Sequence, residues 1–362
     1  MSLALDGVTK VVGAETHISG VSMILEKGTI NILLGGTLSG KTSLMRLMAG
    51  LDHPSSGRIL VDGRDVTGTR VRDRKVAMVY QQFINYPTLS VYENIASPLR
   101  VARLPRAEIE RRVRNAARLL RLETMLDRLP LQLSGGQQQR TAIARALVKG
   151  ADLVLMDEPL ANLDYKLREE LREELPRIFG ASGAVFVYAT TDPTEALLLG
   201  GNTATLFEGA MTQFGSTAAV YRRPNDIVTA RVFSDPPLNT VAATKSGPVI
   251  TLATGGAVPA TAAFLDLPDG AYTIGFRAHQ ATLGGAAGDA ITLPGVVSVS
   301  EISGSESYIH VNVAGIPLVA LADGVRKFDP GTEIALQLDL RRLFVFDTAG
   351  RLVSAPPQAE AV

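Results

Sequence analysis

Residues 30–51, INILLGGTLSGKTSLMRLMAGL, bring together the residue types that hold phosphate groups in proteins. Gly35, Gly40, Lys41 and Thr42 fit the pattern G-x-x-x-x-G-K-[ST]. In this pattern the glycines let backbone N–H groups turn toward phosphate oxygens, the lysine adds a positive charge, and the hydroxyl can ligate Mg²⁺. The sequence therefore predicts a nucleoside triphosphate site in a loop formed by Gly35, Gly36, Thr37, Leu38, Ser39, Gly40, Lys41, Thr42 and Ser43.

Two further segments end in polar residues suited to the same chemistry. Asp157 and Glu158 follow the apolar run LVLM at 153–156, and Gln81 follows KVAMVY at 75–80. A carboxylate at the tip of a buried strand can hold Mg²⁺ through water, and the next carboxylate can orient or activate the attacking water. In isolation such a pair is about as typical of a helix cap as of catalysis. The phosphate loop favours catalysis here.

The elements that position these residues are visible in the apolar pattern. Residues 30–34 form a short apolar run of strand type, and Leu44, Leu47, Met48 and Leu51 then recur at helical spacing. The pattern predicts a strand, the phosphate loop and a helix in that order. Such an arrangement also places the positive end of the helix dipole at the phosphates.

The segment LSGGQQQR at 133–140 runs directly into the helical sequence TAIARALVK. Ser134, Gly135 and Gly136 lie where that helix begins, so a hydroxyl and free N–H groups point outward, as an anion site requires. Alone, the segment indicates only a turn.

A predicted helix at 108–122 combines one apolar face with a run of arginines. Arginines in such a run can grip nucleic acid, but the nearby glutamates Glu108, Glu110 and Glu123 favour a solvated helix face.

Composition limits the remaining function classes. The 362 residues suit two domains, and the 36 Lys plus Arg residues balance the 36 Asp plus Glu residues, which gives no argument for a nucleic-acid partner. The absence of cysteine excludes thiolate metal sites, disulfides and thiol catalysis. The N-terminal residues lack the pattern of a signal peptide. Residues 246–265 are uncharged but interrupted by Gly and Pro, which predicts a hairpin and no membrane helix.

Together these motifs resemble the nucleotide-binding subunits of ATP-binding cassette (ABC) transporters. The phosphate loop is similar to the Walker A motif, Gln81 to the Q-loop glutamine, LSGGQQQR to the signature, LVLMDEP to Walker B, and LANLD at 160–164 to the D-loop. The resemblance implies an α/β fold: a RecA-like ABC ATPase core with antiparallel β and helical subdomains, followed by a small all-β, OB-like domain of the TOBE type. We expect the nucleotide-binding domain at 1–235, its helical subdomain at about 82–150, and the β-rich regulatory domain at 236–362.

The resemblance also implies roles for individual residues, with ATP and Mg²⁺ as cofactors. Glu158, Gln81 and Thr191 take the catalytic positions, and Thr42, Gln81 and Asp157 the metal positions. In this family two cassettes dimerise head to tail, and each ATP lies between one Walker A and the other chain's signature. Ser134, Gly135 and Gly136 therefore serve the partner's nucleotide, and the nucleotide-binding set also includes Gln137 and Asp164.

Three positions depart from the family pattern. Val12 stands where an aromatic residue usually stacks on adenine, with His17 as a candidate substitute. Leu38 replaces a glycine of the loop, and Thr191 stands where the family has its switch histidine. We expect this site to bind ATP better than it hydrolyses it, and the intact signature then favours an unequal pair of cassettes.

Other segments resemble the carbohydrate and polyol importer ATPases, namely QQFINYPTLSVYENIASPL, MTQFGSTAAVYRRPND, GFRAH and the long C-terminal extension. YATTDPTEALLLGG, with the Walker A region, is most similar to bacterial glycerol importers. The partners implied are a second ABC ATPase subunit, two membrane-spanning permease subunits and, indirectly, a periplasmic solute-binding protein, with no nucleic acid. A homodimer is the alternative to the heterodimer. The implied location is peripheral, on the cytoplasmic face of the bacterial inner membrane.

Two other functions stay open. The chain could be mainly a regulatory nucleotide-binding partner of a second, fully active ATPase subunit. A soluble cassette ATPase of DNA repair or translation is less favoured, because such proteins usually carry two cassettes or a long coiled coil.

Overall fold

The computed structural model describes residues 2–82, 84–161, 163–284 and 290–357. The chain divides into two compact units, Met1–Thr217 and Ala218–Val362. The division lies before the boundary that the sequence predicts, because residues 218–235 are tied to strands of the second unit. Arg277 donates a hydrogen bond to the Tyr221 carbonyl (2.7 Å), and the Leu352 N–H donates to the Asn225 carbonyl (2.9 Å).

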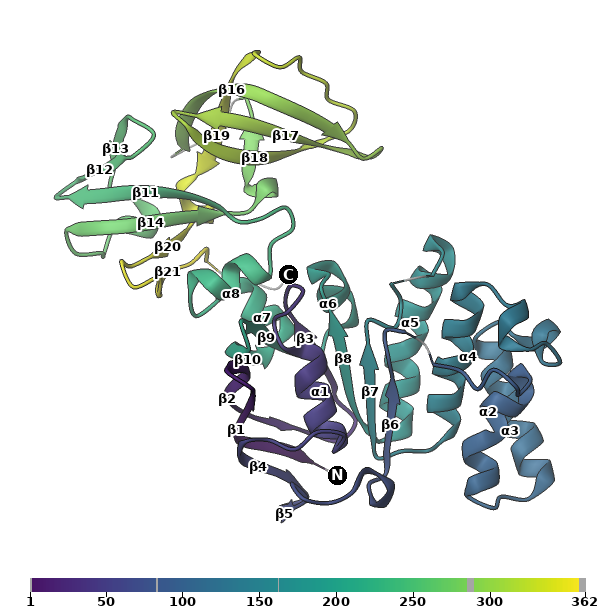
Figure 1. Cartoon of the computed structure of the whole chain (residues 1–362). Helices are drawn as coiled ribbons and strands as arrows, with labels where there is room; N and C mark the ends of the chain where they lie inside the picture. The colour runs from purple at the N-terminus through teal and green to yellow at the C-terminus, as the bar shows by residue number, and fades with distance from the viewer. Residues whose placement is uncertain (1, 83, 162, 285–289, 358–362) are drawn as a thin grey trace. The chain divides into compact units, whose positions relative to one another are not determined.

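The first unit is built on one sheet with the strand order β5-β4-β1-β2-β10-β9-β3-β8-β7-β6 in the described residues (Figure 1). Its strands are β1 (Leu3–Val12), β2 (Glu15–Leu25), β3 (Ile30–Leu34), β4 (Ser56–Val61), β5 (Arg64–Asp65), β6 (Val76–Val79), β7 (Leu153–Asp157), β8 (Val185–Thr190), β9 (Asn202–Phe207) and β10 (Ala210–Ser216). Its helices are α1 (Lys41–Ala49), α2 (Val91–Val101), α3 (Arg106–Leu119), α4 (Gly135–Val148), α5 (Tyr165–Ser182) and α6 (Pro193–Leu199).

The strands β9, β3, β8, β7 and β6 run parallel, and β5, β4, β1 and β2 pair antiparallel with one another. Strand β10 joins the two groups, because it pairs in parallel with β2 and antiparallel with β9. Every residue of β7 and β8 is buried, as expected for central parallel strands covered on both faces. Because the carboxyl ends of parallel strands meet at one edge of a sheet, the segments that follow β3, β8, β7 and β6 lie together. These segments carry the phosphate loop, Thr191, Glu158 and Gln81.

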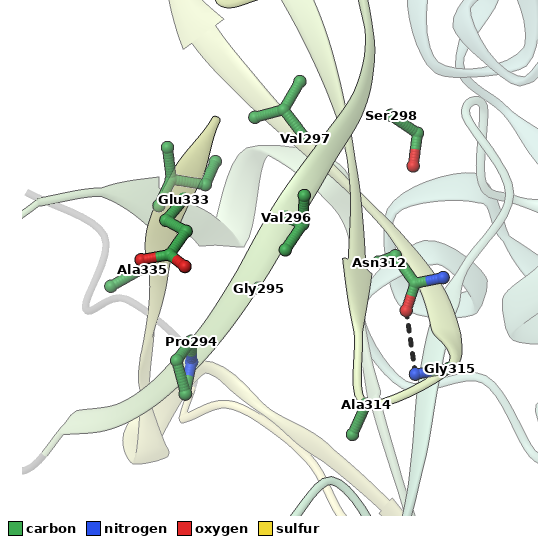
Figure 2. Close-up of a pocket in the computed structure, with 11 residues that line it drawn as sticks. Pro294, Gly295, Val296, Val297, Ser298, Asn312, Ala314, Gly315, Glu333 and Ala335 are labelled. Carbon is green, nitrogen blue, oxygen red and sulfur yellow. Dashed lines mark hydrogen bonds between the residues drawn. The ribbon is translucent and has the colours of Figure 1, made fainter. Parts of the chain in front are cut away.

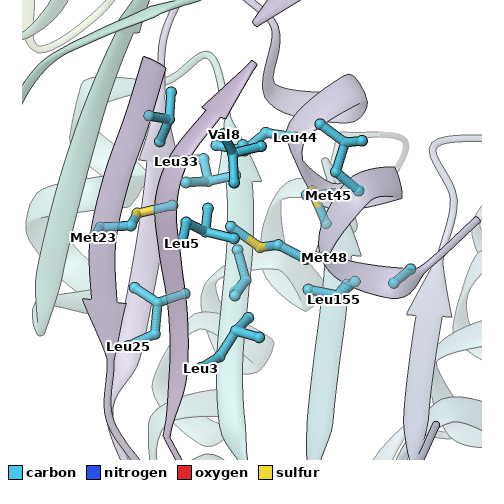
Figure 3. Close-up of a cluster of buried hydrophobic side chains, with 14 of the residues drawn as sticks. Leu3, Leu5, Val8, Met23, Leu25, Leu33, Leu44, Met45, Met48 and Leu155 are labelled. Carbon is cyan, nitrogen blue, oxygen red and sulfur yellow. The ribbon is translucent and has the colours of Figure 1, made fainter. Parts of the chain in front are cut away.

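The helix predicted after the phosphate loop is α1. Its apolar side chains Leu44, Met45 and Met48 pack against Leu5 and Val8 of β1 in a common core (Figure 3). Gly40, with φ 101°, precedes α1, and Gly50, with φ 76°, caps its end. Glycine takes these left-handed conformations at no steric cost, so the helix is bounded by the sequence itself.

Helices α2, α3 and α4 pack together within the segment predicted as a helical subdomain (Figure 1). Two of them begin with reciprocal capping boxes, Ser90 with Glu93 and Ser134 with Gln137. The glutamates at 108 and 110 bind arginines 111, 112 and 114 of the same helix, so this face is a solvated ion-pair surface, as expected. No helix in the described part of the chain is long and apolar enough to cross a membrane.

The second unit begins with short helices and continues as an all-β fold. Strands of two sheets, ordered β13-β12-β11-β14-β20-β21 and β15-β19-β16-β17-β18, enclose one core that includes Val241, Ile274, Ile291 and Leu336. The hairpin predicted at 246–265 corresponds to β12 and β13, which pair antiparallel. The elements are α7 (Thr217–Arg222), α8 (Ile227–Val232), β11 (Asn239–Ser246), β12 (Val249–Leu252), β13 (Ala257–Pro259), β14 (Gly270–Phe276), β15 (Ala281–Leu283), β16 (Ala290–Ile302), β17 (Glu306–Val313), β18 (Ile316–Asp323), β19 (Glu333–Asp339), β20 (Phe344–Phe346) and β21 (Leu352–Ser354).

Candidate nucleotide site

A pocket of about 790 Å³ in the first unit gathers most of the residues that the sequence singles out. The phosphate loop forms one end, and Gln81, Glu158 and Thr191 lie beside it. The start of β2 and the β9–β10 turn complete the lining, and the Gly209 N–H donates to the Ser39 carbonyl at 3.1 Å. The lining residues are Glu15, Thr16, His17, Thr37, Leu38, Ser39, Gly40, Lys41, Thr42, Ser43, Gln81, Glu158, Thr191, Glu208 and Gly209.

Lys41 lies inside its own loop. Its Nζ donates hydrogen bonds to the carbonyl oxygens of Gly35 (2.8 Å) and Gly36 (2.9 Å). Burial lowers the pKa of Lys41, an effect that the charges of Glu158 and Asp157 oppose. A buried ammonium that is held only by carbonyl oxygens gains most from an anion in the same loop.

The N-terminus of α1 fits phosphate. No side chain caps it, and its first turn holds no acidic residue. The Ser39 hydroxyl is buried without a hydrogen-bond partner. Gly40 must be glycine, because a Cβ there would lie 2.8 Å from Ile18 Cδ1 and 2.9 Å from the His17 carbonyl oxygen. The loop thus offers backbone N–H donors, the Ser39 hydroxyl and the Lys41 ammonium, which is hydrogen-bonded to carbonyl oxygens and not to an anion.

The predicted metal residues lie where the loop meets the end of β7. Thr42 Oγ1 donates to Asp157 Oδ2 at 2.7 Å. Burial raises the pKa of Asp157, and the Thr42 hydrogen bond and the Lys41 charge oppose this. No cluster of three His, Cys, Asp or Glu residues occurs among the described residues. Thr42, Asp157 and Gln81 offer oxygen atoms, the ligands that Mg²⁺ prefers, and would hold this ion together with phosphate oxygens.

Hydrogen bonds hold both the side chain and the backbone of Glu158. Gln81 Nε2 donates to Glu158 Oε2 at 3.1 Å, and the Glu158 N–H donates to the Ala189 carbonyl at 3.0 Å. The backbone of Glu158 has φ 46°, an uncommon conformation for a non-glycine residue and one that recurs at functional sites. Burial raises the pKa of Glu158, which moves it toward the range in which a carboxylate accepts a proton at neutral pH.

The position of Val12 near adenine stays a prediction. Val12 lies at the end of β1, pairs with Glu15 across the hairpin, is 48% exposed, and does not line the pocket. The return strand presents Glu15, Thr16 and His17 instead, because the hairpin turns at Gly13. Of the described lining residues, His17 carries the only ring, and its Nε2 lies 3.7 Å from Glu15 Oε2. Sequence reasoning had noted His17 but not Glu15, Thr16 or Glu208.

The signature residues do not line this pocket. Ser134 caps α4, where Gly135 and Gly136 begin the helix, and its hydroxyl accepts the Gln137 N–H (3.4 Å) while Gln137 Oε1 accepts the Ser134 N–H (2.9 Å). Asp164 caps α5 and accepts the Leu167 N–H at 3.0 Å. Residue 162 of the predicted D-loop lies outside the described residues. The assignment of these motifs to a partner's nucleotide therefore stays a prediction.

One contact was not predicted. Gln139, which is buried in α4, donates to the carbonyl oxygens of Glu158 and Pro159. The helix that begins with Ser134–Gly136 is thus hydrogen-bonded to the backbone of Glu158 and Pro159.

A second groove, of about 880 Å³, lies in the second unit on the outer side of the β16–β17–β19 sheet (Figure 2). Val296 pairs with Asn312 on one side and Glu333 on the other. Asn312 Oδ1 already accepts the Gly315 N–H at 2.8 Å. The groove contains none of the predicted site residues.

Comparisons with known proteins place the chain. The family model described as ABC transporter matches residues 18–161, and the TOBE domain model matches 274–346. The trehalose/maltose import ATP-binding protein of Thermococcus litoralis is 34% identical, covering 96% of this chain and 98% of that protein. The chain belongs to the ABC transporter ATP-binding subunits. The sn-glycerol-3-phosphate import ATP-binding protein of Rhizobium meliloti is 36% identical over 92% of this ABC subunit and 94% of its own length.

Among solved structures, a dimeric ATP-binding cassette in a post-hydrolysis state, bound to ADP and Pi, is 28% identical with a TM-score of 0.54. It covers 59% of this ABC subunit and 98% of its own chain. The predicted family, the fold class and the ATP and Mg²⁺ cofactors are thereby confirmed. This ABC subunit is an ATPase whose hydrolysis is coupled to transport, and subunits of its kind dimerise and act with membrane permease components.

Proposed function

We propose that this ABC subunit powers the import of a carbohydrate or polyol, with glycerol as the favoured solute, from the cytoplasmic face of a bacterial inner membrane. The convergence of Lys41, Thr42, Gln81 and Glu158 in one pocket carries the ATPase part of the proposal. The importer part is supported by relatives named for trehalose/maltose, alpha-glucoside and sn-glycerol-3-phosphate. The choice of glycerol rests on the resemblance of the Walker A region and residues 188–201.

The site residues divide the work of phosphoryl transfer. Bound MgATP supplies the phosphoryl group and the divalent charge. Lys41 and the α1 N–H groups hold the β and γ phosphates, while Thr42 and Asp157 orient the metal side. Glu158 orients water and accepts its proton, and Gln81 fixes the Glu158 carboxylate by the 3.1 Å hydrogen bond. A raised pKa makes Glu158 a stronger base once it is ionised.

A groove of about 430 Å³ beside the segment that follows Gln81 is the proposed permease contact. It lies between β6, α2 and α4, with Met78, Tyr86 and Val101 as apolar lining and Arg145 and Lys149 as positive groups. Arg145 stacks over the Tyr86 ring at 4.9 Å. This surface fits a permease segment with apolar and acidic side chains. Because it lies close in sequence to Gln81, which donates a hydrogen bond to Glu158, movement of the permease would be transmitted to Glu158.

Val101→Glu tests this contact, because Val101 is exposed and a carboxylate there would spoil an apolar fit. The permease subunits should no longer co-purify, whereas ATP binding should stay unchanged. Val71→Glu, at another exposed valine, is the matched control. Equal loss in both variants, or in neither, would refute this groove as the contact.

We further propose that the subunit is one half of an unequal pair. Its pocket has a hydroxyl, Thr191, in place of the switch histidine, while Ser134–Gln137 keep an intact capping box for the partner's nucleotide. Ser134→Arg should then impair transport more than Thr191→Ala. Full transport by this subunit alone with its permease would argue for a homodimer.

A mainly regulatory role is the second candidate, favoured by Thr191 and by Leu38, which is 94% exposed at the mouth of the pocket in a left-handed conformation (φ 65°). Single-turnover hydrolysis by the purified protein separates the two roles. ATP bound but not cleaved, with or without permease, would favour regulation.

The whole proposal is tested by reconstitution in vesicles with the permease subunits and the solute-binding protein. ATP hydrolysis should rise with glycerol and not with maltose. A response to maltose alone would overturn the solute assignment and leave the ATPase assignment intact.

A further inference from the structure

A buried polar cluster lies directly behind Thr191. Glu195 of α6 and Arg172 of α5 have side chains only 8% and 10% exposed. Tyr188 and Thr190 of β8 are almost completely buried beside them. Buried charges cost free energy unless they are paired and fully hydrogen-bonded, so such a cluster invites a reason beyond packing.

Glu195 is the centre of the cluster. Its Oε2 accepts hydrogen bonds from Thr190 Oγ1 (2.6 Å) and Tyr188 OH (3.1 Å). Its Oε1 accepts from the Arg172 guanidinium at 3.2 Å. Burial, together with the Glu195 charge, raises the pKa of Tyr188 well above its usual value. Both carboxylate oxygens are therefore engaged, one by β8 and the other by α5.

Arg172 extends the cluster to α5 and to the turn after β8. It donates to Glu169 (2.6 Å) on its own helix and to Asp192 (3.4 Å), the residue that follows Thr191. Helix α5 is the helix that Asp164 caps. A displacement of α5 would therefore pull directly on the turn that carries Thr191.

The backbone on each side of Thr191 is fixed by the same cluster. Thr190 Oγ1, which donates to Glu195, also accepts the Asp192 N–H at 3.0 Å. The Thr190 carbonyl accepts the Gly35 N–H of the phosphate loop at 3.4 Å. The preceding residue, Ala189, accepts the Glu158 N–H. The loop, the base and Thr191 are thus held to one short stretch of β8.

We propose that Glu195 and Arg172 are positioning residues, which set the Thr191 turn at the phosphate end of the pocket and couple it to α5. The proposal rests on the ATPase function proposed above. A cluster that only stabilised the fold would be replaceable by apolar residues of similar volume. A positioning cluster would instead control the rate of hydrolysis while ATP affinity stays nearly constant.

Glu195→Gln tests this, because it keeps the shape and removes the charge that holds Arg172. In the full-length protein, single-turnover ATP hydrolysis should fall at least about tenfold, whereas the ATP Kd should change less than about threefold. Glu174→Gln, at a partly exposed glutamate of α5 that pairs with Arg177 at 3.5 Å, is the matched control and should have no effect. Should Glu195→Gln not fold, Tyr188→Phe, which removes one hydrogen bond to Glu195, should give a smaller fall of the same kind.

A double-mutant cycle with Thr191→Ala decides whether Glu195 acts through the turn. If it does, the two rate losses are not additive, because Thr191 no longer contributes to the rate once the loss of the Glu195 charge has freed its turn. Additive losses, or an unchanged rate in Glu195→Gln, overturn the positioning role. Hydrogen exchange of the Asp192 amide gives a readout independent of turnover: it should be faster in Glu195→Gln with ATP bound. A wild-type protein that binds ATP but does not cleave it would defeat the proposed function, whereas unchanged Asp192 exchange defeats the inference.

Discussion

Replacing Lys41 by methionine separates the cost of burying its charge from the benefit of that charge to nucleotide binding. The side chain keeps its length, but the ammonium that now contacts the Gly35 and Gly36 carbonyls is lost. Two hydrogen bonds worth about 1 kcal/mol each disappear from the free protein. The free protein is also relieved of a buried cation, whose lowered pKa shows that burial disfavours its charge. The two effects oppose each other.

The free energy of unfolding without nucleotide should therefore change by no more than about 1–2 kcal/mol. ATP binding should suffer much more. Charge-assisted hydrogen bonds contribute about 1.5–3 kcal/mol each, so losing the lysine contacts to two phosphates costs about 3–6 kcal/mol. That corresponds to a Kd that is roughly two to four orders of magnitude weaker.

Isothermal titration with MgATP and thermal unfolding without it measure the two quantities on the same samples. Lys75→Met is the control, since Lys75 is 80% exposed and lies 3.8 Å from Asp152. It should leave both quantities unchanged. An ATP affinity within threefold of wild type in Lys41→Met would refute the phosphate-loop assignment. Loss of affinity together with a large fall in Tm would show that Lys41 acts mainly on the fold.

Further predictions concern Glu158, His17 and, in the second unit, Arg277. Because burial raises the pKa of Glu158, the hydrolysis rate should fall on acidification at a higher pH than an ordinary glutamate would give, as a pH–rate profile would measure. Glu158→Gln should slow single-turnover hydrolysis at least about a hundredfold while ATP stays bound. His17→Ala should weaken ATP binding about tenfold if the His17 ring stacks on adenine, as titration with MgATP would measure. An unchanged Kd would show that adenine is contacted by other residues. Arg277 is 6% exposed and stacks on the Tyr221 ring at 3.7 Å. Denaturant unfolding should show that Arg277→Ala destabilises the second unit by about 2–4 kcal/mol, and Arg277→Met by clearly less. Equal losses of stability in the two variants would show that the charge of Arg277 matters and its packing does not.

The grouping of the phosphate-loop residues with Gln81 and Glu158 in one pocket is predictable from the sequence, because phosphate binding needs fixed residue types at fixed spacing. Gly40, Lys41 and Thr42 are adjacent in sequence and in space, and a parallel sheet brings Gln81 and Glu158 to the same edge. The lining that the start of β2 contributes depends on which face of the β1–β2 hairpin turns toward the phosphate loop. That face is set by the pairing of β1 with β2, which includes three irregularities of register. A single sequence carries little signal for this, and from the sequence His17 was named without the neighbouring Glu15 and Thr16.

Contacts between helices were also missed, although the sequence held a weak signal for them. Gln139 lies on the same helical face as the buried Ala142 and Ile143, and Glu195 on the same face as Leu199. A polar residue on an apolar helical face needs a buried partner. The partner itself is not readable, since the Pro159 carbonyl and the Tyr188 hydroxyl come from distant segments. The contact between Asn225 and Leu352, which ties the segment before residue 235 to the second unit, is likewise visible only in the fold.

The two units also differ in when their hydrogen-bond partners are synthesised. Every strand of the ten-stranded sheet described here comes from the first 217 residues, so that sheet can close while the ribosome is still making the tail. The second unit cannot do this: β14 must wait for β20, some seventy residues later. A nascent chain would therefore acquire its nucleotide pocket before its tail is folded, and MgATP already present in the cell could bind and stabilise that first half during synthesis.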